Sequence, residues 1–517
     1  MIRSAHIFVK KRLVSWYSIM GTGLICKCCF YDKNGGVFYG MGMLEEAMNF
    51  INNNKVSRNE IWENISLNGR KLPQRFIFAK LRKYISDFLK NKTLEPRMVG
   101  IAGIRGVGKT TLLWQIADFV KSNFKGVKIY FLSMDVASDY GFESKILIEA
   151  LKNVISSNQK VVLLFDETQY MENWSLMLKI LYDKFKNAFI IATGSSSLLI
   201  HSTVDLSMRW NLESLYPLCF TEFVMISSWL KSEGKKAIFP EKGLGGEIKD
   251  ALFSSESAED VVTKLAKIED KVREYFMKIE NSPITQSWEN YLNEYIFYRN
   301  IPRLLLIDEK NTIVSRTFDL LHRVLYQDLR EFYEQNEIGK IGRFLTLLAF
   351  SDEINKEKIS QSLGIKVEKV DKIVESLIKA ELLIRFPIYG GIKTRVKKEK
   401  LFFTSPTMRY AIIKQLFSKT EQFHSKLYED ITALYLKRIF NGLVLYGGIE
   451  EDEKSPDFIV EINDGIIPIE VGTSKKDLSQ LDSIKEKKYG LLVNFKSNRV
   501  RMINDNVIVP LKWFLLI

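Results

Sequence analysis

Between residues 91 and 223, short apolar runs alternate with segments of helical periodicity. Four of these runs have the length and composition of strands that are buried on both faces. They lie at residues 98–102, 127–133, 161–165 and 187–192. Apolar side chains recur at helical spacing in residues 111–120 and 143–155. Because strands and helices alternate, we predict an α/β fold with a parallel, doubly wound sheet.

The pattern changes after residue 223. Charged helical segments dominate residues 224–335, and we interpret them as a helical lid beside the sheet. Three further helical patterns then precede a short apolar strand; they lie at residues 341–350, 356–363 and 367–380, with the strand at 382–384. This is the order of a winged helix-turn-helix. Residues 406–517 combine a helix with a hairpin and a later apolar strand, which predicts a mixed α/β domain.

Residues 103–110 (GIRGVGKT) join the first predicted strand to the first predicted helix. They fit the pattern G-x-x-x-x-G-K-[ST], in which backbone N–H groups cradle a triphosphate. The lysine reaches the β- and γ-phosphates, the hydroxyl ligates Mg²⁺, and the helix N-terminus favours an anion. A glycine-rich turn without a ligand is the alternative. We expect ATP to contact Gly103, Arg105, Gly106, Val107, Gly108, Lys109, Thr110 and Thr111.

The apolar run at residues 161–165 ends in Asp166 and Glu167. A buried parallel strand would deliver both carboxylates at its C-terminal end, where open α/β sheets bind ligands. We expect Asp166 to hold Mg²⁺, and Glu167 to orient and deprotonate the attacking water. Taken alone, such a pair favours the alternative, a solvated strand end. The phosphate loop upstream favours the catalytic interpretation.

The strand predicted at 187–192 ends in TGSSS, and a polar side chain there, Ser195, is placed to sense the γ-phosphate. In order, IRGVGKTTLL, LLFDE, IIATGSSSLL and LYPLCFTEF resemble a widespread AAA+ family of archaea and bacteria. Its members join the ATPase to a winged helix and a C-terminal PD-(D/E)XK nuclease-like domain. Where that family has Gly-Arg, this chain has Met208-Arg209, and YRNIP at residues 298–302 replaces a Gly-Gly-x-Pro turn. The resemblance implies that Arg209 is an arginine finger, with a surface arginine as the alternative.

Three acidic residues follow the order of that family's metal site: Glu429 on a helix, then Asp457 and Glu470 on a hairpin. The resemblance implies that they hold Mg²⁺ or Mn²⁺, which polarises a scissile phosphate and generates hydroxide. The family's lysine, two residues after Glu470, is Gly472 here. Two interpretations stay open. Either Lys475 reaches back and the domain cleaves, or the domain keeps only its fold.

The resemblance divides the chain into five segments. They are an N-terminal extension with lead-in helices (1–90), an AAA+ core (91–223), a helical lid (224–335), a winged helix-turn-helix (336–405) and a nuclease-like domain (406–517). It implies a Mg²⁺-dependent ATPase that couples nucleotide state to a DNA-acting winged helix and a metal-dependent nuclease-like domain. The alternative is a nucleotide-dependent switch with an inactive scaffold domain. Homo-oligomers occur among AAA+ proteins, so one is compatible with this interpretation.

Composition narrows the partners and the chemistry. The net charge of +13 favours an acidic polymer such as DNA, and the segment at 385–400 carries six cations against one glutamate. Cys26, Cys28 and Cys29 crowd together, away from Cys219, and the chain has four histidines. This argues against a closed zinc site and a disulfide framework. No apolar run is long enough to span a bilayer, so we expect a cytoplasmic protein without a membrane partner.

Overall fold

The computed structural model describes most of the chain from residue 41 onwards. The described residues are 29–31, 37–39, 41–194, 206, 208–234, 236–282, 287–329, 333–351, 356–390, 399–440, 445–449, 455–462, 465–473 and 475–517. The predicted Ser195, and the cations Lys393, Arg395, Lys397 and Lys398, lie outside these residues.

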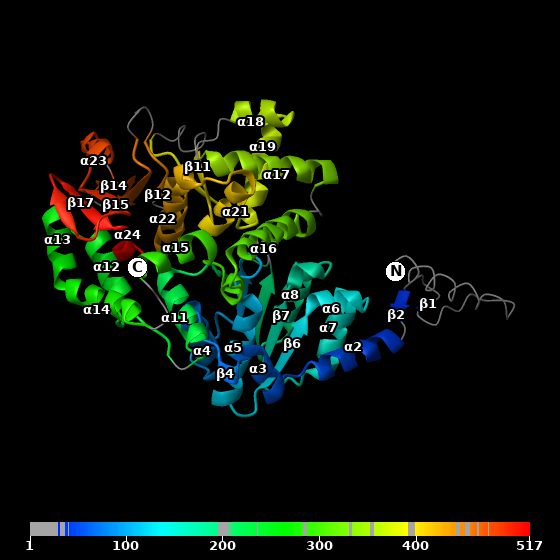
Figure 1. Ribbon diagram of the computed structural model, residues 1–517. Helices are drawn as coiled ribbons and strands as arrows, with labels where there is room; N and C mark the ends of the chain where they lie inside the picture. The colour runs from blue at the N-terminus through cyan, green and yellow to red at the C-terminus, as the bar shows by residue number, and fades with distance from the viewer. Residues whose placement is uncertain are drawn as a thin grey trace.

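An all-parallel sheet of five described strands forms the base of the molecule (Figure 1). In spatial order these are β6 (Lys128–Ser133), β7 (Val161–Asp166), β8 (Ala188–Gly194), β5 (Met98–Ala102) and β9 (Asn211–Ser214). The four predicted strands and the doubly wound α/β class are confirmed. The strand β9 was not predicted, because its residues, NLES, are exposed or half-buried and form no apolar run. Since β8 separates β5 from β7, the C-terminal ends of all three strands meet at one edge.

Helices cover both faces of this sheet. One face carries α3 (Arg58–Ile65), α4 (Ile77–Leu89) and α5 (Lys109–Asn123), with the small hairpin β3 (Ser66–Leu67) and β4 (Arg70–Lys71) between the first two. The other carries α2 (Met41–Asn53), α6 (Met134–Asp139), α7 (Ser144–Val154) and α8 (Trp174–Lys184), with the turn η1 (Thr168–Tyr170). A short antiparallel ribbon, β1 (Cys29–Tyr31) with β2 (Val37–Tyr39), precedes them. The helix α5 is buried on most sides rather than on a single stripe, because α3, α4 and the sheet enclose it.

The next segment separates into two groups of helices. The first is η3 (Pro302–Leu306), α16 (Lys310–Arg323) and the π-helical turn η4 (Val324–Asp328). The second is α12 (Leu244–Phe253), α13 (Ala258–Lys267) and α14 (Glu269–Glu280), followed by α15 (Trp288–Asn293) and the π-helical turn η2 (Glu294–Tyr298). The helix α11 (Phe220–Lys231) precedes both groups and packs Phe220, Phe223 and Val224 into the hydrophobic cluster of the second.

The prediction of one lid over residues 224–335 is wrong for α12, α13 and α14. These helices share a hydrophobic core with the C-terminal sheet, on the side of the molecule far from the parallel sheet (Figure 1). Tyr489 donates to the backbone oxygen of Leu252 at 3.0 Å, and Lys488 pairs with Glu256 at 2.9 Å. An amphipathic helix packs wherever a matching apolar surface exists, and its periodicity does not say where that surface lies.

Three helices and an antiparallel hairpin form the next unit. They are α17 (Gln335–Phe350), α18 (Lys356–Leu363) and α19 (Val367–Lys379), then β10 (Leu383–Pro387) and β11 (Glu399–Phe403). The predicted helices and the first strand are confirmed as elements. The apolar stripe of α19 is buried as expected, at Val370, Ile373, Val374 and Leu377.

The C-terminal segment places helices around a mixed sheet. Its helices are α21 (Pro406–Leu416), the short η5 (Glu421–Phe423), α22 (His424–Phe440), α23 (Lys475–Asp482) and α24 (Leu511–Phe514). The described strands run in the spatial order β12 (Leu445–Tyr446), β13 (Phe458–Ile462), β14 (Gly465–Gly472), β15 (Gly490–Asn494), β17 (Asn506–Pro510) and β16 (Arg501–Ile503). The pairs β14–β15 and β15–β17 are parallel, and the others are antiparallel.

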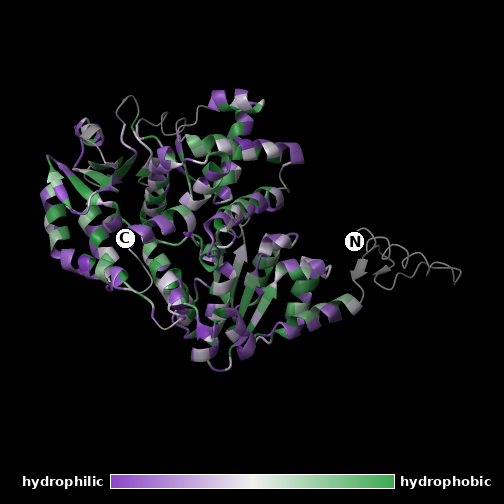
Figure 2. Cartoon of the chain, in the orientation of Figure 1, coloured by the Kyte–Doolittle hydropathy of each residue, from purple (hydrophilic) through white to green (hydrophobic). Residues whose placement is uncertain are grey.

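Apolar side chains gather where these units meet. The strands of the parallel sheet are strongly hydrophobic along their length, while the outer helices carry polar residues on their free faces (Figure 2). Among the helices that the structure describes, none is long and apolar enough to cross a membrane.

Candidate active sites

The phosphate loop lies between β5 and α5, as its sequence predicts. Gly106 and Gly108 have φ angles of +80° and +100°, which favour glycine because other side chains rarely adopt them. Lys109 is 4% exposed, and its Nζ donates to the backbone oxygens of Gly103 at 2.8 Å and Ile104 at 3.4 Å. The lysine ammonium therefore lies inside the loop whose N–H groups would cradle a phosphate.

Asp166 lies at the C-terminal end of β7 beside two hydroxyl groups. Thr110 donates to Asp166 Oδ2 at 2.7 Å, and the hydroxyl of Thr193 donates to Asp166 Oδ1. Burial raises the pKa of the Asp166 carboxyl above its ordinary value. Thr193 opens the TGSSS run, in which the sequence pattern had pointed to Ser195. The position of Thr193 at the end of β8, the strand between β5 and β7, explains why it reaches both other strands.

Glu167 follows Asp166 with a left-handed backbone, at φ +51°. Such a conformation is uncommon for a residue other than glycine and is found where the surrounding structure enforces it. The Glu167 N–H donates to Thr193 Oγ1 at 3.3 Å, and Gln169 donates to its carboxylate. Glu167 lines the same cavity as the phosphate loop.

That cavity has a volume of about 430 Å³ and is closed by parts of the chain far from the loop in sequence. Beyond the loop, Glu167 and part of α5, its walls include Leu72, Pro73, Arg75, Ile226, Leu230, Pro302, Arg303, Leu306, Leu320 and Arg323. Arg303 also donates its N–H to the backbone oxygen of Gly106 at 3.3 Å. Arg303 and Arg323 were not among the predicted site residues. The departure from the family pattern at residues 298–302 was the signal that this turn is specialised.

Two arginines that the sequence analysis selected have partners in the same chain. Arg105 pairs with Asp328 of η4 at 2.8 Å and donates to Tyr170 Oη at 2.6 Å. Arg209 Nε lies 3.1 Å from Asp183 Oδ1 of α8 and does not line the nucleotide cavity. This arrangement therefore does not bring Arg209 to the phosphate loop of its own chain.

A chain of polar contacts, one hydrogen bond and two ion pairs, leads from the phosphate loop to the C-terminal domain through buried Glu222. Arg75 donates to the backbone oxygen of Val107 at 2.9 Å, and its Nε lies 2.9 Å from Glu222 Oε1. On the other side, Arg438 of α22 lies 3.8 Å from Glu222 Oε2. Glu222 is 1% exposed and also accepts the N–H groups of Phe76 and Cys219. The glutamate of the PLCFTEF box thus joins three segments of the chain.

We expect the stability contributed by Glu222 to depend on pH. Although burial alone would raise it, Arg75 and Arg438 hold the pKa of Glu222 at about 2, below the ordinary 4.5. A lowered pKa means that this stability is present above about pH 4.5 and is lost as pH falls toward 2. The difference in unfolding free energy between the parent and Glu222→Gln should be roughly 3 kcal/mol at pH 7.

Denaturant unfolding of both proteins between pH 3 and 7 measures this difference. The difference in unfolding free energy between the parent and Glu222→Gln should become smaller as pH falls below about 4.5. Glu486→Gln, at an exposed position of the C-terminal domain, is the matched control and should show no such narrowing. A difference that stays constant across this pH range would contradict the assignment.

Asp457 and Glu470 face each other across the β13–β14 hairpin. The Asp457 N–H donates to Glu470 Oε2 at 3.0 Å, and the Val471 N–H donates to Asp457 Oδ2 at 2.9 Å. Burial, and then the neighbouring Asp457 carboxylate, raise the pKa of Glu470 to about 9. A Cβ atom at Gly472 would collide with the Asp477 carboxylate, so Asp477 fills the space that a lysine there would need.

The predicted set of three carboxylates is not assembled. Within the described residues, no group of three or more His, Cys, Asp or Glu side chains is arranged to hold a metal ion. Glu429 on α22 instead lies 3.4 Å from Lys426, one turn away on the same helix. Lys475 begins α23, and its side chain lies outside the described residues. Lys400 of β11 packs against Gly447, and its charge lowers the pKa of Glu470.

The sheet order and the phosphate loop between β5 and α5 are those of a P-loop AAA+ fold. Residues 95–224 match a family model described as an AAA domain, and residues 289–419 match a domain of unknown function (DUF8612). An uncharacterised protein of Methanocaldococcus jannaschii is 26% identical over 462 residues, covering 86% of this chain and 90% of that protein.

This chain is also similar to two solved structures. A Walker-type ATPase of Pyrococcus abyssi is 15% identical, with a TM-score of 0.34, and the match covers 68% of this chain and 99% of that one. The Aeropyrum pernix ORC1 protein in complex with DNA is 10% identical, with a TM-score of 0.29, and the match covers 71% and 98%.

Proposed function

We propose that this chain is a Mg²⁺-dependent ATPase that couples its nucleotide state to a DNA-acting winged helix and to a metal-dependent nuclease-like domain. The observation that carries the proposal is the buried chain of contacts from Val107 through Arg75 and Glu222 to Arg438. A change at the phosphate loop has a direct polar path to α22 of the C-terminal domain. That path gives coupling a physical basis.

In the ATPase site, different groups of the chain bind the phosphates, activate the water and hold the metal ion. Lys109 and the N–H groups of the loop bind the phosphates, and Arg303 and Arg323, which line the same cavity, add positive charge. Glu167 orients the attacking water and accepts its proton. Thr110 and Asp166 fit Mg²⁺, because hydroxyl and carboxylate oxygens are its preferred ligands. When bound, the ion would neutralise charge on the phosphate oxygens.

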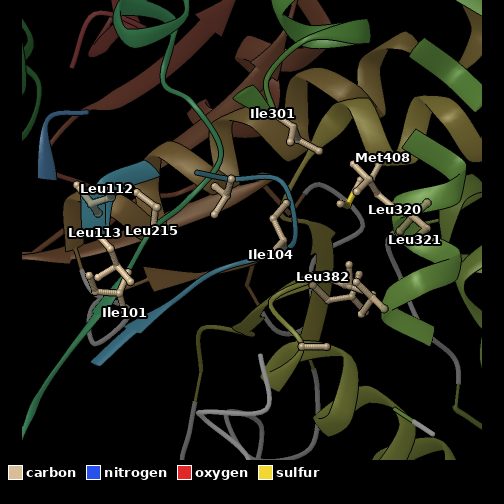
Figure 3. Close-up of a cluster of buried hydrophobic side chains, with 14 of the residues drawn as sticks. Ile101, Ile104, Leu112, Leu113, Leu215, Ile301, Leu320, Leu321, Leu382 and Met408 are labelled. Carbon is tan, nitrogen blue, oxygen red and sulfur yellow. The ribbon is translucent and has the colours of Figure 1, made fainter. Parts of the chain in front are cut away.

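A second, apolar junction supports the coupling. Ile104 of the phosphate loop belongs to one hydrophobic cluster with Leu382, which follows α19, and with Leu320 and Met408 (Figure 3). Beside it, burial raises the pKa of Glu381 to about 7, while the charge of Lys109 acts in the opposite direction. Thus the phosphate loop interacts with the turn that joins α19 to β10 in two ways. Ile104 shares a hydrophobic cluster with Leu382, and the charge of Lys109 acts on Glu381.

We interpret residues 335–403 as a winged helix, because three helices precede an antiparallel hairpin. The chain's charge of +13 supports a DNA partner. A homo-oligomer is supported by Arg209, which lies outside its own cavity and would act as an arginine finger only in a neighbouring copy.

A cleavage assay with single-stranded, duplex and branched DNA tests the C-terminal part. It uses Mg²⁺ or Mn²⁺, with and without ATP. If the domain cleaves, we expect Glu470→Ala to lose at least 100-fold in rate, because it removes one of the paired carboxylates. Glu486→Ala, at an exposed position of the same domain, should retain full activity. Lys109→Ala shows whether ATP binding controls cleavage.

The second candidate function is an ATP-dependent switch whose C-terminal domain is an inactive scaffold. Two observations favour it: Asp477 occupies the space beside Gly472, and Glu429 does not join Asp457 and Glu470. An intact ATPase that cleaves none of the DNA substrates would establish this function over the first. If the parent and Glu486→Ala cleave DNA and Glu470→Ala does not, the inactive-scaffold function is excluded.

A further inference from the structure

The connection between β15 and β16 holds a group of cations in exposed positions. Buried Asn494 accepts the N–H groups of Lys496 at 2.9 Å and Ser497 at 2.7 Å, which organises the start of the connection. Lys496, Arg499 and Arg501 are exposed around it. The ATPase chemistry and the acidic pair make no use of these residues.

A cavity of about 510 Å³ opens beside this connection. Among the described residues, those that line it and carry charge are Lys496, Arg499 and Arg501, and none of the described lining residues is acidic. It also reaches Thr473, the residue after β14. Gly472 of β14 pairs in register with Asn494 of β15. The cavity therefore lies at the carboxyl ends of these two strands, the first of which carries Glu470. A polyanion bound there would pass close to the acidic pair.

A second cavity, of about 610 Å³, adjoins the first and shares Asn498 and Arg499 with it. Its wall includes Phe276, Trp288 and Trp513. Lys512 lies over the Trp288 ring, 4.4 Å from its centroid, and donates to Asn498 Oδ1 at 3.1 Å.

The second cavity also has acidic lining residues, Glu269 and Glu280. Glu269 lies 3.9 Å from Arg273, which also lines this cavity. Cations beside an aromatic wall are the combination by which proteins hold unpaired nucleotides, with the backbone on the cations and the bases against the rings.

We propose that the two adjoining cavities bind single-stranded DNA, with its phosphates along Lys496, Arg499 and Arg501 and a base in the aromatic cavity. The size of that cavity selects the single strand, because a base enters such a pocket only after it leaves the duplex stack. This proposal rests on the DNA-acting function above and names the form of DNA and its route to the acidic pair.

Fluorescence anisotropy with a labelled 20-nucleotide oligo(dT) and a labelled 20-bp duplex tests it, between 50 and 200 mM salt. The triple variant Lys496→Ala, Arg499→Ala, Arg501→Ala should raise the Kd for oligo(dT) at least tenfold. It should reduce the salt slope by about 2, since each phosphate contact contributes about 0.7. Trp288→Leu should raise the Kd about tenfold through lost stacking. Both variants should keep the ATPase rate and thermal midpoint of the parent.

The matched control removes three exposed lysines at the end of α4 and in the ATPase core: Lys90→Ala, Lys92→Ala, Lys125→Ala. It changes the net charge equally and should leave the Kd within about twofold. Equal losses of oligo(dT) affinity in both triple variants would overturn the single-strand proposal but not the DNA-acting function. Tighter binding of the parent to duplex than to oligo(dT) would do the same. So would unchanged binding by the first triple variant. A parent that binds neither DNA would also overturn the DNA-acting function.

Discussion

Replacing Glu167 by glutamine should lower kcat for ATP hydrolysis by about 10² to 10⁴-fold, the usual contribution of a positioned general base. Glutamine keeps the size of the side chain but accepts no proton from water. Glu167 lines the cavity and is held by Thr193 and Gln169 beside Asp166. ATP binding should persist, because Lys109 and the loop N–H groups are unchanged.

Phosphate release at saturating ATP, together with binding of a fluorescent ATP analogue, measures the two effects separately. Glu172→Gln is the control, since Glu172 is exposed five residues further along the same connection and does not line the cavity. It should retain the parent's kcat. A Glu167→Gln variant that hydrolyses ATP at the parent's rate would show that another group activates the water.

The largest effect on stability is expected from Asp430→Ala. Arg409 and Asp430 are both fully buried, and they form a bidentate pair at 2.7 and 2.9 Å that joins α21 to α22. Arg409 also donates to backbone oxygens at the end of α17, and Asp430 accepts the N–H of Phe403 in β11. Removing the aspartate leaves a buried guanidinium without its partner. That loss typically costs about 3–5 kcal/mol.

Guanidinium chloride unfolding, followed by tryptophan fluorescence, measures the shift in midpoint for the transition that includes this junction. Replacing both partners, Arg409→Met with Asp430→Leu, should cost much less, because no unpaired charge stays buried. Lys278→Ala is the control and should cost at most about 0.5 kcal/mol, because its pair with Glu274 is exposed. The assignment fails if Asp430→Ala unfolds at the midpoint of Lys278→Ala.

The local part of the nucleotide site was predictable from the sequence. A phosphate loop needs glycines, a lysine and a hydroxyl at fixed spacing, so Gly106, Gly108, Lys109 and Thr110 are recognisable without a structure. The end of a strand was harder to place. The polar run after residue 192 offered several hydroxyls, and the structure brings Thr193 to Asp166, while the predicted Ser195 lies outside the described residues.

The distant walls of that site were not predictable. Arg303 and Arg323 come from elements about 200 residues after the loop, and nothing in their local sequence indicates that they line the same cavity as the loop. The same holds for Glu222, whose box was noticed as a pattern but whose bonds to Arg75 and Arg438 depend on three separate segments. Side-chain identity gives the capacity for an ion pair, and chain topology decides whether the two groups meet.

The sequence by itself therefore determined the α/β class, four of the five described strands of the parallel sheet and the core of the phosphate-binding chemistry. These depend on interactions within short stretches of chain, where periodicity and spacing are sufficient. Only the tertiary structure decided that α12, α13 and α14 cover the C-terminal sheet and that Asp477 fills the space at Gly472. It also decided that Glu429 does not join the acidic pair. Those outcomes depend on which apolar and charged surfaces meet after folding, a choice that no local pattern encodes.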